Sequence, residues 1–510
     1  MKAMSKKRFF SILLCLCLLC TMLPVTKANA ATSNSAIAIS SAEDLLKMRD
    51  DPSGSYYLTK DITVSENMQV FNDLTYGGTA FTGTFDGKGY KIKGYKANIT
   101  ASEYPQISLF GKTKDATFKN LTLSDVNINV KSDYGAQVSA LANGSATCSK
   151  VTVTGKITVS GNETTSWETM EYDIYGLCTN GTFTNCTNKA NITANCRVKY
   201  YVGSFVAGIA RFGTFKNCKN TGTISMTGTA TSDEYMNVAG IAIRGTHSGC
   251  SNSGTIKVKG MVGDRDYPIF AAGVSVAPDK ISSCSNSGKV TVENLTNGDV
   301  FAAGVAARPE SDSTSTKCYN TGAVSIKQMG GKFCCGGVFA EEDLISQCYN
   351  TGKVTVTASK NQDKDTGMVG GVIGYAGLVS ECYNTGAVSA NTKGKVGGVA
   401  GLSDYMNEWT VIHCYNTGKV SGKKGSLFVG GILGSYDNGA VNSIGKYFVY
   451  DNYSITSPLY GRAQISWEPY WGRGTKVSSI TTSSCPKLSG KYWTYSGKHK
   501  RLILKNIKEK

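Results

Sequence analysis

The chain has 510 residues, of which 58 are glycine and only 9 proline, and its formal net charge at pH 7 is +17. It contains three histidines and no Cys-x-x-Cys pair beyond residue 30, so we expect no bound metal and no cofactor. No nucleic-acid-binding motif accompanies the positive charge, and basicity alone does not indicate DNA or RNA as a partner.

Residues 1–30 have the pattern of a secretory signal peptide. Four cations between residues 2 and 8 precede an apolar run at 9–23, and Ala-Asn-Ala at 28–30 offers small residues for cleavage after Ala30. No later stretch is apolar enough to span a bilayer, so we expect no transmembrane segment after the signal peptide. The predicted location is secreted, extracellular or non-covalently associated with the cell wall.

Residues 36–110 are expected to form an N-terminal cap and the first turns of the main domain. Ser40 with Glu43, or Ser41 with Asp44, has the spacing of a helix capping box. The residues that follow predict a short amphipathic helix. Such a helix would cover the open apolar end of a stacked β-structure, which would aggregate if it were bare.

The next part of the chain repeats one phrase, Cys-Tyr-Asn-Thr-Gly or a looser copy, followed by an alternating apolar strand. Successive cysteines lie between 30 residues (Cys318 to Cys348) and 38 residues (Cys148 to Cys186) apart. A period in this range is typical of stacked repeat proteins. After the weakest copy at Cys148, the phrase occurs at Cys186, Cys218, Cys250, Cys284, Cys318, Cys348, Cys382 and Cys414.

The repeats have the strand period of two and no helical period. Residues 111–444 therefore predict an all-β fold, a right-handed parallel β-helix of roughly a dozen coils. The repeated cysteines are expected to form an inward structural ladder and the asparagines a hydrogen-bonded ladder at the bend. Reduced thiols are favoured because each stacked cysteine has two equivalent neighbours, although export also permits disulfides. Of Cys334 and Cys335, one is expected to face outward.

A family resemblance follows from these motifs. Gly-Thr-Phe-Asp-Gly at 83–87 and Leu-Phe-Gly at 109–111, after the cap helix, resemble the opening of pectin-lyase-like β-helices of bacterial surface proteins. Gly-Gly-apolar-apolar-Gly at 370–374, 397–401 and 430–434 resembles GLUG-motif repeats. The resemblance implies a secreted or surface protein that acts in adhesion or recognition. Some relatives carry a zinc peptidase, but this chain has no His-Glu-x-x-His. The first half departs from the motif: its last glycine is missing, and alanine replaces its first glycine at Ala207, Ala239, Ala272 and Ala303.

The tyrosine that follows the cysteine in four consecutive repeats predicts an outward aromatic ladder. Aromatic rings in a row can stack on sugar rings, which makes a glycan, mucin or cell-wall polymer the expected ligand. The alternative is that the stacked rings only stabilise the sheet. The ladder consists of Tyr319, Tyr349, Tyr383 and Tyr415.

Residues 445–510 are expected to form an aromatic and basic C-terminal cap. From Arg473 to Lys510 the chain has ten Lys or Arg and one acid, Glu509. This segment could be a solvated terminus or could attach the protein to an anionic polymer. The residues proposed for attachment are Lys498, Lys500, Arg501 and Lys505.

The remaining polar residues give no catalytic pattern. Groups of two or three acids at 233–234, 264–266, 341–343 and 363–365 are interpreted as solvated loop charges, and Arg244, Arg265 and Arg308 as solubilising. His247 is expected in a turn, His413 on an outward position, and His499 in the basic tail. We predict no catalytic residue, and whether the chain is an enzyme stays open.

The function predicted from the sequence is a secreted or cell-surface β-helical binding protein, an adhesin-like module for glycan, mucin or cell-wall polymer. One alternative is a polysaccharide lyase or glycoside hydrolase, which would require two or three acids converging in a groove beside a loop arginine. The other is a structural spacer without a ligand.

Overall fold

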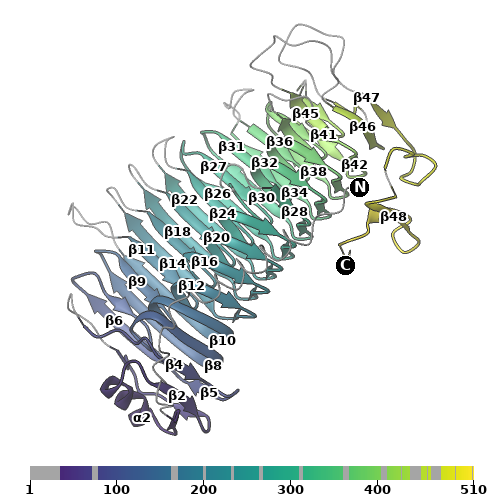
Figure 1. Cartoon of the computed structure of the whole chain (residues 1–510). Helices are drawn as coiled ribbons and strands as arrows, with labels where there is room; N and C mark the ends of the chain where they lie inside the picture. Colours follow the sequence, from purple (N-terminus) through teal and green to yellow (C-terminus); the bar gives the residue numbers. More distant parts are fainter. Residues whose placement is uncertain are drawn as a thin grey trace, which may run out of the picture.

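The repeats stack as parallel strands along one long axis, in a computed structural model (Figure 1). The β-helix has about 10 turns and one short α-helix near its N-terminal end, as the sequence predicts for the fold class. The predicted signal peptide lies outside the described residues. The structure describes residues 35–71, 78–161, 171–198, 203–230, 235–262, 268–308, 314–359, 367–403, 411–424, 426, 428–436, 449–456, 458–460, 473–488, 490–507 and 509.

One strand of each turn belongs to an eleven-stranded parallel sheet that runs along one face. This strand is the Gly-centred apolar run of the repeat, and its length is limited to two to four residues by the bend that follows it. Its strands are β7 (Gln106–Ile107), β9 (Ala136–Ser139), β11 (Tyr172–Tyr175), β15 (Ser204–Ala207), β19 (Met236–Ala239), β23 (Ile269–Ala272), β27 (Val300–Ala303), β31 (Phe333–Gly336), β35 (Gly367–Gly370), β39 (Lys395–Gly397) and β44 (Val429–Gly430).

After this sheet the chain bends at a glycine and an apolar residue and enters a second strand, which ends before the cysteine. These strands pair in parallel register from one turn to the next. They are β12 (Cys178–Thr184), β16 (Phe212–Lys216), β20 (Ala242–Ser248), β24 (Ser275–Ser282), β28 (Thr314–Thr316), β32 (Phe339–Ser346), β36 (Ile373–Ser380), β40 (Ala400–Ser403), β41 (Val411–Ile412) and β45 (Leu433–Tyr436), and in the first turns the long strands β8 (Lys112–Ser132) and β10 (Ala142–Gly161) continue through the later bends.

Two further strands complete each turn. The first is a two-residue strand that contains the repeated asparagine: β13 (Thr187–Asn188), β17 (Lys219–Asn220), β21 (Ser251–Asn252), β25 (Ser285–Asn286), β29 (Tyr319–Asn320), β33 (Tyr349–Asn350), β37 (Tyr383–Asn384) and β42 (Tyr415–Asn416). The second is the alternating apolar strand: β14 (Asn191–Val198), β18 (Ile224–Ala230), β22 (Ile256–Val262), β26 (Val290–Asn294), β30 (Val324–Gln328), β34 (Val354–Ala358), β38 (Val388–Ala390) and β43 (Val420–Ser421).

The asparagine ladder predicted at the bend is confirmed. From Asn188 to Asn416, each buried side chain donates from Nδ2 to the Oδ1 of the next asparagine at 2.7 or 2.8 Å. The same Nδ2 donates to the carbonyl oxygen two residues further on, as from Asn320 to Gly322 at 2.7 Å. Each side-chain amide therefore hydrogen-bonds to a backbone carbonyl of its own turn and to the asparagine of the next turn.

The repeated cysteines lie in a buried column, and every cysteine that the structure describes is a free, buried thiol. The backbone N–H of Cys348, for example, lies 3.3 Å from Cys382 Sγ. One of Cys334 and Cys335 does face outward as expected, but neither is an exposed thiol, since both are fully buried. Cys334 points out of the coil, but it packs against Ala303 and Ala340.

His247 is also placed differently from the prediction. It lies within β20, fully buried, and its ring stacks on Phe215 with centroids 4.8 Å apart. Phe215 stacks in turn on Phe183, in register, so His247 occupies an interior aromatic column. Neither of its ring nitrogens has a hydrogen-bond partner within the described part of the chain.

The N-terminal end begins with β1 (Ile37–Ile39), the helix α2 (Ala42–Lys47) and a 3-10 turn (Met48–Asp50). The predicted capping box is confirmed for Ser41, whose Oγ accepts a hydrogen bond from the Asp44 N–H at 3.2 Å. Leu45 and Met48 are buried against the first turns, so the helix covers that end of the core (Figure 1). The first turns contain β2 (Ser55–Leu58), β3 (Ile62–Thr63), β4 (Thr84–Asp86), β5 (Lys91–Lys93) and β6 (Lys96–Ala101).

At the C-terminal end, β46 (Val449–Ser454) and β47 (Arg473–Lys476) continue the parallel stack, and β48 (Trp493–Ser496) pairs antiparallel with β49 (Arg501–Leu504). The hairpin of β48 and β49 lies beside the last turns (Figure 1). Within the described residues, no helix is long and apolar enough to cross a bilayer.

Candidate functional site

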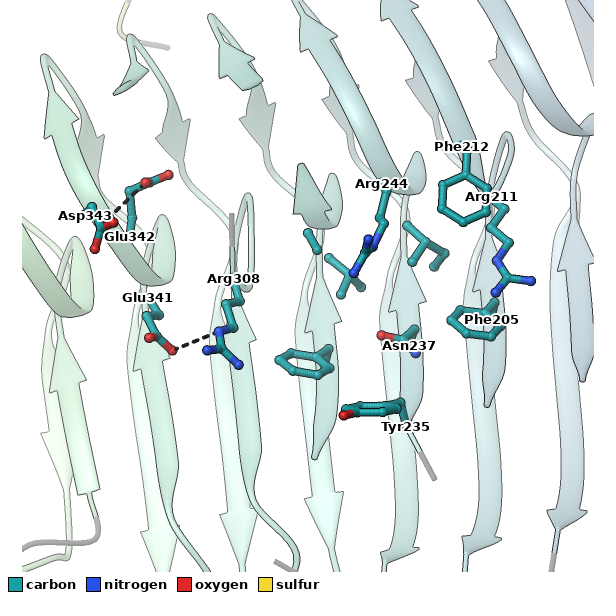
Figure 2. Close-up of a pocket in the computed structure, with 14 residues that line it drawn as sticks. Phe205, Arg211, Phe212, Tyr235, Asn237, Arg244, Arg308, Glu341, Glu342 and Asp343 are labelled. Atoms are coloured by element: carbon teal, nitrogen blue, oxygen red, sulfur yellow. Dashed lines mark hydrogen bonds and ion pairs between the residues drawn. The ribbon is translucent and has the colours of Figure 1, made fainter. Parts of the chain in front are cut away.

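A groove of about 640 Å³ runs along one face of the β-helix, over the turns between β15 and β32 (Figure 2). It lies where the eleven-stranded sheet and the strand that follows it meet at an angle. The first wall is the outward column of the sheet, in which each residue is in register with the next. This column consists of Phe205, Asn237, Phe270 and Phe301.

The second wall is formed by residues near the start of the following strand. Arg244 pairs with Ala277 of the next turn, and Arg308 follows in the turn after that. Glu341 continues the column beyond Arg308. The second wall therefore presents four groups in order along the groove, namely Arg244, the methyl group of Ala277, Arg308 and the carboxylate of Glu341 (Figure 2).

The floor of the groove is built at positions where this chain departs from the Gly-Gly-apolar-apolar-Gly pattern. In the turns that form the groove, alanine replaces the first glycine of this motif. Ile243, Val276 and Ala307 replace its last glycine, and they are buried together with the alanines. In the later turns glycine occupies the first position, in register with the alanines. The floor alanines are Ala207, Ala239 and Ala272, and Ala303 begins the next buried cluster.

Glycine is required in the later turns because the bend there is tight. A Cβ added at Gly370 would lie well under 3.0 Å from the carbonyl oxygen of Ile373, and one at Gly397 would meet Ala400 in the same way. A Cβ at Gly374 would lie 2.5 Å from Cys334 Sγ on the opposite wall. The two walls are thus in contact where the Gly-Gly-apolar-apolar-Gly motif is intact, and they are separated where larger residues replace its glycines.

Aromatic rings make the first wall largely apolar. Phe270 stacks on Phe301 with centroids 5.1 Å apart and on Tyr235 at 6.3 Å. Tyr235 remains 43% exposed at the rim. The Arg308 guanidinium lies 5.9 Å from the Phe301 ring, so cations and rings alternate across the groove.

The N-terminal end of the groove is closed by a partly buried ion cluster. Arg211 lies 3.8 Å above the Phe205 ring and pairs with both Glu171 and Asp173. The Tyr175 hydroxyl donates to Asp173 at 2.6 Å. Burial raises the pKa of Asp173, and the neighbouring Arg211 opposes that shift. Arg211 is therefore already neutralised by its own neighbours.

Three consecutive acids form the other end. Glu341 accepts a 3.6 Å ion pair from Arg308 Nε, and burial raises its pKa. Glu342 is almost completely buried, which raises its pKa to about 8, and its Oε2 lies 2.5 Å from Ser315 Oγ. Asp343 is exposed, and its backbone N–H donates to Glu342 Oε1 at 3.0 Å. At neutral pH, the buried Glu342 carboxyl therefore favours its protonated form, and the exposed Asp343 follows it in the chain.

For Glu341 and Glu342, the sequence-based interpretation as solvated loop charges is therefore wrong. Glu341, Glu342 and Asp343 lie in strand β32, and the first two are not solvated loop charges. Arg244 and Arg308 line the groove with them. Residues 233–234, 264–266 and 363–365, including Arg265, lie outside the described part of the chain. No group of three potential ligands suitable for a metal ion occurs among the described residues.

The tyrosine ladder forms, but it is not an exposed surface. Tyr319, Tyr349, Tyr383 and Tyr415 stack with ring centroids 4.9 Å apart. The last three are fully buried, because the hairpin of β48 and β49 packs over them. The Trp493 ring lies 5.9 Å from Tyr383 and 5.4 Å from Tyr415. The face expected to bind a ligand instead binds the C-terminal segment of the same chain.

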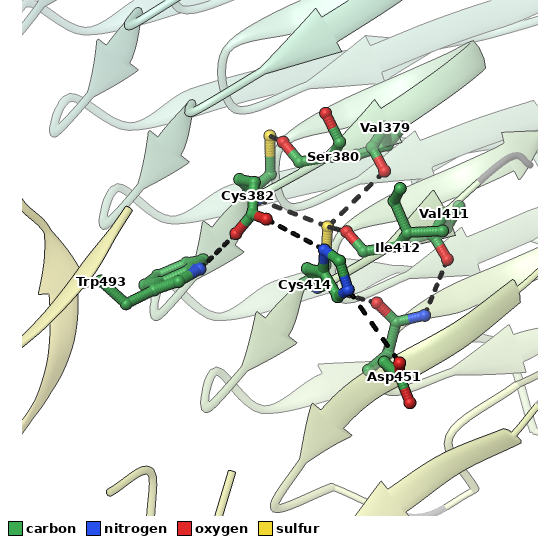
Figure 3. A network of polar contacts seen from close by, with 11 residues as sticks. Val379, Ser380, Cys382, Val411, Ile412, Cys414, Asp451 and Trp493 are labelled. Atoms are coloured by element: carbon green, nitrogen blue, oxygen red, sulfur yellow. Dashed lines mark hydrogen bonds and ion pairs between the residues drawn. The ribbon is translucent and has the colours of Figure 1, made fainter. Parts of the chain in front are cut away.

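Polar contacts fasten this hairpin to the solenoid (Figure 3). Trp493 Nε1 donates to one oxygen of the nearly buried Glu381 carboxylate, and His413 Nδ1 lies 2.9 Å from the other. The hydrogen bond with Glu381 raises the pKa of His413. The Tyr415 hydroxyl donates to the Leu502 carbonyl oxygen at 2.5 Å.

The basic residues proposed for attachment divide into two groups. Lys498, Lys500 and Lys505 are exposed on or beside the hairpin. Arg501 is mostly buried, pairs with Glu509, and donates to the Tyr415 hydroxyl at 3.0 Å. Arg501 therefore fixes the hairpin in place and does not present its charge to an external polymer.

Comparison with known families matches residues 27–155 to the N-terminal region of the M26 IgA1-specific metallo-endopeptidases. This segment contains α2 and the first turns and ends before the groove. A crystal structure of a candidate immunoglobulin A1 protease from Bacteroides ovatus aligns over 93% of both chains, with 11% identity and a TM-score of 0.26. A comparison with curated proteins finds no significant match.

Proposed function

We propose that this chain is a secreted or cell-surface β-helical binding protein that holds a segment of glycan in the groove. The observation that carries the proposal is the groove itself, with an apolar floor and aromatic wall opposite a wall of polar and charged side chains. Ligand sites of proteins combine concave apolar surface with a few placed polar groups in this way.

Two resemblances support a role in recognition. The repeats resemble GLUG-motif repeats of bacterial surface proteins, in which adhesion or recognition is the expected role. The N-terminal segment is similar to a region of proteases named for their action on immunoglobulin A1. Immunoglobulin A1 and mucin therefore belong in the panel of targets beside cell-wall polymers.

The test is binding of the mature chain to an array of host, mucin and cell-wall glycans, followed by titration calorimetry of the best ligand. Ala277→Trp places a large ring opposite Phe270, where the second wall has only a methyl group, and should abolish binding. Thr291→Trp adds the same ring on β26 and serves as the control. Binding that survives Ala277→Trp, or no glycan binding by the unmodified chain, would refute the proposal.

A second candidate function is glycoside hydrolysis in the same groove, favoured by the raised pKa of Glu342, which lines the groove together with Asp343. Glu342 would donate its proton to the glycosidic oxygen as the bond to the anomeric carbon breaks. Asp343 would take a proton from the water whose oxygen bonds to that carbon. Release of reducing ends that is lost in Glu342→Gln while glycan binding persists would establish it. Bound glycan that stays intact on long incubation would exclude it.

We also propose that the exposed Lys498, Lys500 and Lys505 assist attachment to an anionic polymer. Exposed charges interact through a screened potential, so such binding should weaken steeply with added salt. Changing the three lysines to glutamine should reduce retention on an anionic matrix, whereas Lys353→Gln, Lys419→Gln and Lys289→Gln should reduce it less. Equal losses in the two triple variants would show that only net charge matters.

A further inference from the structure

Resting on the proposed function, we infer that the groove selects glycans that carry an acetamido group, and that the Asn237 side chain is the residue that hydrogen-bonds to this group. The ligand class is therefore an N-acetylhexosamine and not a sugar with a hydroxyl group at the same carbon. Acetamido groups occur both in cell-wall polymers and in mucin glycans, so the test includes a ligand of each kind.

Asn237 is the polar member of a column that is otherwise aromatic. It lies in β19 on the first wall of the groove, in register with Phe205 of the preceding turn and Phe270 of the following turn. Its side chain lines the groove on the same wall as these rings (Figure 2). Since phenylalanine occupies the positions on both sides, the stacking of the turns does not itself require an amide here.

The amide of Asn237 has no hydrogen-bond partner within the described part of the chain, although the residue is only 6% exposed. The asparagines of the buried ladder differ in this respect, since the Asn320 side chain makes four hydrogen bonds. A buried polar group without a partner is unfavourable, and few occur in native structures. The part of Asn237 that remains exposed lines the groove, so water or a ligand there supplies the missing contacts.

The chemistry of a primary amide defines what the ligand has to offer. Asn237 Nδ2 can donate two hydrogen bonds, and Oδ1 can accept. A ligand that displaces water from this amide must present both an acceptor and a donor, because an unmatched group loses its hydration without compensation. In a 2-acetamido sugar, the carbonyl oxygen would accept from Nδ2, and the hydroxyl group on the neighbouring carbon would donate to Oδ1.

The depth of the amide favours an acetamido group over a hydroxyl group. An asparagine side chain is shorter than a phenylalanine side chain, so the Asn237 amide lies below the edges of the Phe205 and Phe270 rings. Adjacent parallel strands are about 4.8 Å apart, so these two rings are separated by roughly 10 Å along the groove. A planar acetamido group fits the slot between them. A sugar that rests on the ring edges would bring its acetamido oxygen to the amide, whereas a hydroxyl group on the sugar ring would end short of it.

The methyl end of an acetamido group also has complementary surroundings. Phe205 and Phe270 flank the slot, and Ile243 lies on the floor of the groove. Tyr235 stacks on Phe270 at the rim and is 43% exposed, so its ring can cover the apolar face of the sugar. The groove therefore offers an amide for the polar part of the substituent and apolar side chains for the methyl group.

The experiment compares ligands that differ only in the group at one carbon of the sugar. Chitohexaose and cellohexaose have the same linkage and carry acetamido and hydroxyl groups, respectively. A mucin peptide with α-linked N-acetylgalactosamine and the same peptide with α-linked galactose form the second pair. Affinities are measured by titration calorimetry for the unmodified chain, Asn237→Leu and Asn237→Ala. The control is Asn195→Leu, which removes an exposed amide of β14 outside the groove.

We expect the acetamido member of at least one pair to bind roughly 10-fold to 100-fold more tightly than its hydroxyl counterpart, the effect of satisfying a buried amide. Asn237→Leu and Asn237→Ala should remove this preference by weakening only the acetamido member, and Asn195→Leu should retain it. Urea denaturation confirms that each variant is folded. A merely structural role of Asn237 would weaken both members of a pair alike and would leave their ratio unchanged.

Three results would overturn the inference while the proposed function stands, provided that Ala277→Trp still blocks binding. The unmodified chain could bind the two members of each pair equally or prefer the hydroxyl sugars. Both Asn237 variants could keep the preference for the acetamido member. Both variants could weaken the two members to the same extent. If no saccharide binds the unmodified chain, the inference and the proposed function both fail.

Discussion

Replacing Asn320 with alanine should destabilise the β-helix more than any surface change of the same size. Asn320 is fully buried, and its side chain makes four hydrogen bonds: Nδ2 donates to Gly322 O and to Asn350 Oδ1, and Oδ1 accepts from Asn286 Nδ2 and from Gly322 N. The first three are 2.7 to 2.8 Å long and the last is 3.2 Å.

A buried neutral hydrogen bond contributes about 1 kcal/mol, and a partner left unsatisfied costs about 1 to 3 kcal/mol. Four lost hydrogen bonds therefore predict a decrease of about 4 kcal/mol in the free energy of unfolding. Asn286 Nδ2 and Asn350 Oδ1 each keep one other partner, Gly288 and Gly352, which prevents a larger loss.

The measurement is urea denaturation combined with hydrogen exchange read by mass spectrometry. Each turn of a solenoid contacts only its neighbours, so exchange should accelerate mainly in the turns of Asn286, Asn320 and Asn350. Thr321→Ala, at the next position along the chain, should change the free energy of unfolding by no more than about 0.5 kcal/mol. A loss below about 1 kcal/mol for Asn320→Ala, or uniform acceleration along the whole solenoid, would refute the reasoning.

Three further predictions concern the hairpin, the acidic end and the tight bends. The pKa of His413 is raised from 6.5, chiefly by Glu381, while Asp451 adds to the shift and Lys487 opposes it. The pair of His413 and Glu381 therefore stabilises the fold fully below pH 6.5, and this contribution is lost as the pH rises through the pKa of His413 in the folded state. The difference in unfolding free energy between the unmodified chain and His413→Gln should therefore shrink on alkalinisation, and a difference that is independent of pH would contradict this. The pKa of Glu342 is raised from 4.5 to about 8, so the unmodified chain should lose stability relative to Glu342→Gln as the pH rises between these values. If the free energies of unfolding of the two proteins vary in parallel with pH, the carboxyl is not buried as described. Gly370→Ala should cost about 1 to 3 kcal/mol in urea denaturation because its Cβ meets the Ile373 carbonyl, whereas Gly490→Ala, with open space around it, should cost little; equal effects would mean that the bend is not tight.

The inward columns were predictable because their residues repeat. Cysteine and asparagine recur at one position of each turn, and a side chain that stacks on its own copies must satisfy the same contacts in every turn. The asparagine ladder followed directly from this reasoning, whereas the cap helix followed from its own capping residues. His247 was expected in a turn, because the sequence analysis did not place it in the same column as Phe183 and Phe215, which precede it by two turns and one turn.

The outward surface was harder to predict, because its contacts join residues far apart in the chain. The stacking of Tyr383 on Tyr415 follows from the repeat, but its coverage by Trp493 does not, since nothing in the repeat indicates where the last residues fold back. Likewise, Arg244 and Arg308 come from separate turns, and each looked like an isolated surface charge. One signal for the groove was present in the sequence, namely the alanines that replace glycine in the first half.

Those alanines suggest how a solenoid of this kind acquires a site. The interior requires nearly constant residues, since each turn must stack on the next. The bend between the eleven-stranded sheet and the following strand instead tolerates two sets of residues. Glycine lets the walls touch, as at Gly370, and alanine with a larger residue four positions on, as at Ala272 and Val276, holds them apart. Replacing the first and last glycines of the motif thus opens a groove without disturbing the asparagine ladder, which continues through these turns. The two outward aromatic columns differ in what surrounds them. The Phe270 column lies in an opened bend, whereas the Tyr383 column is covered by the hairpin.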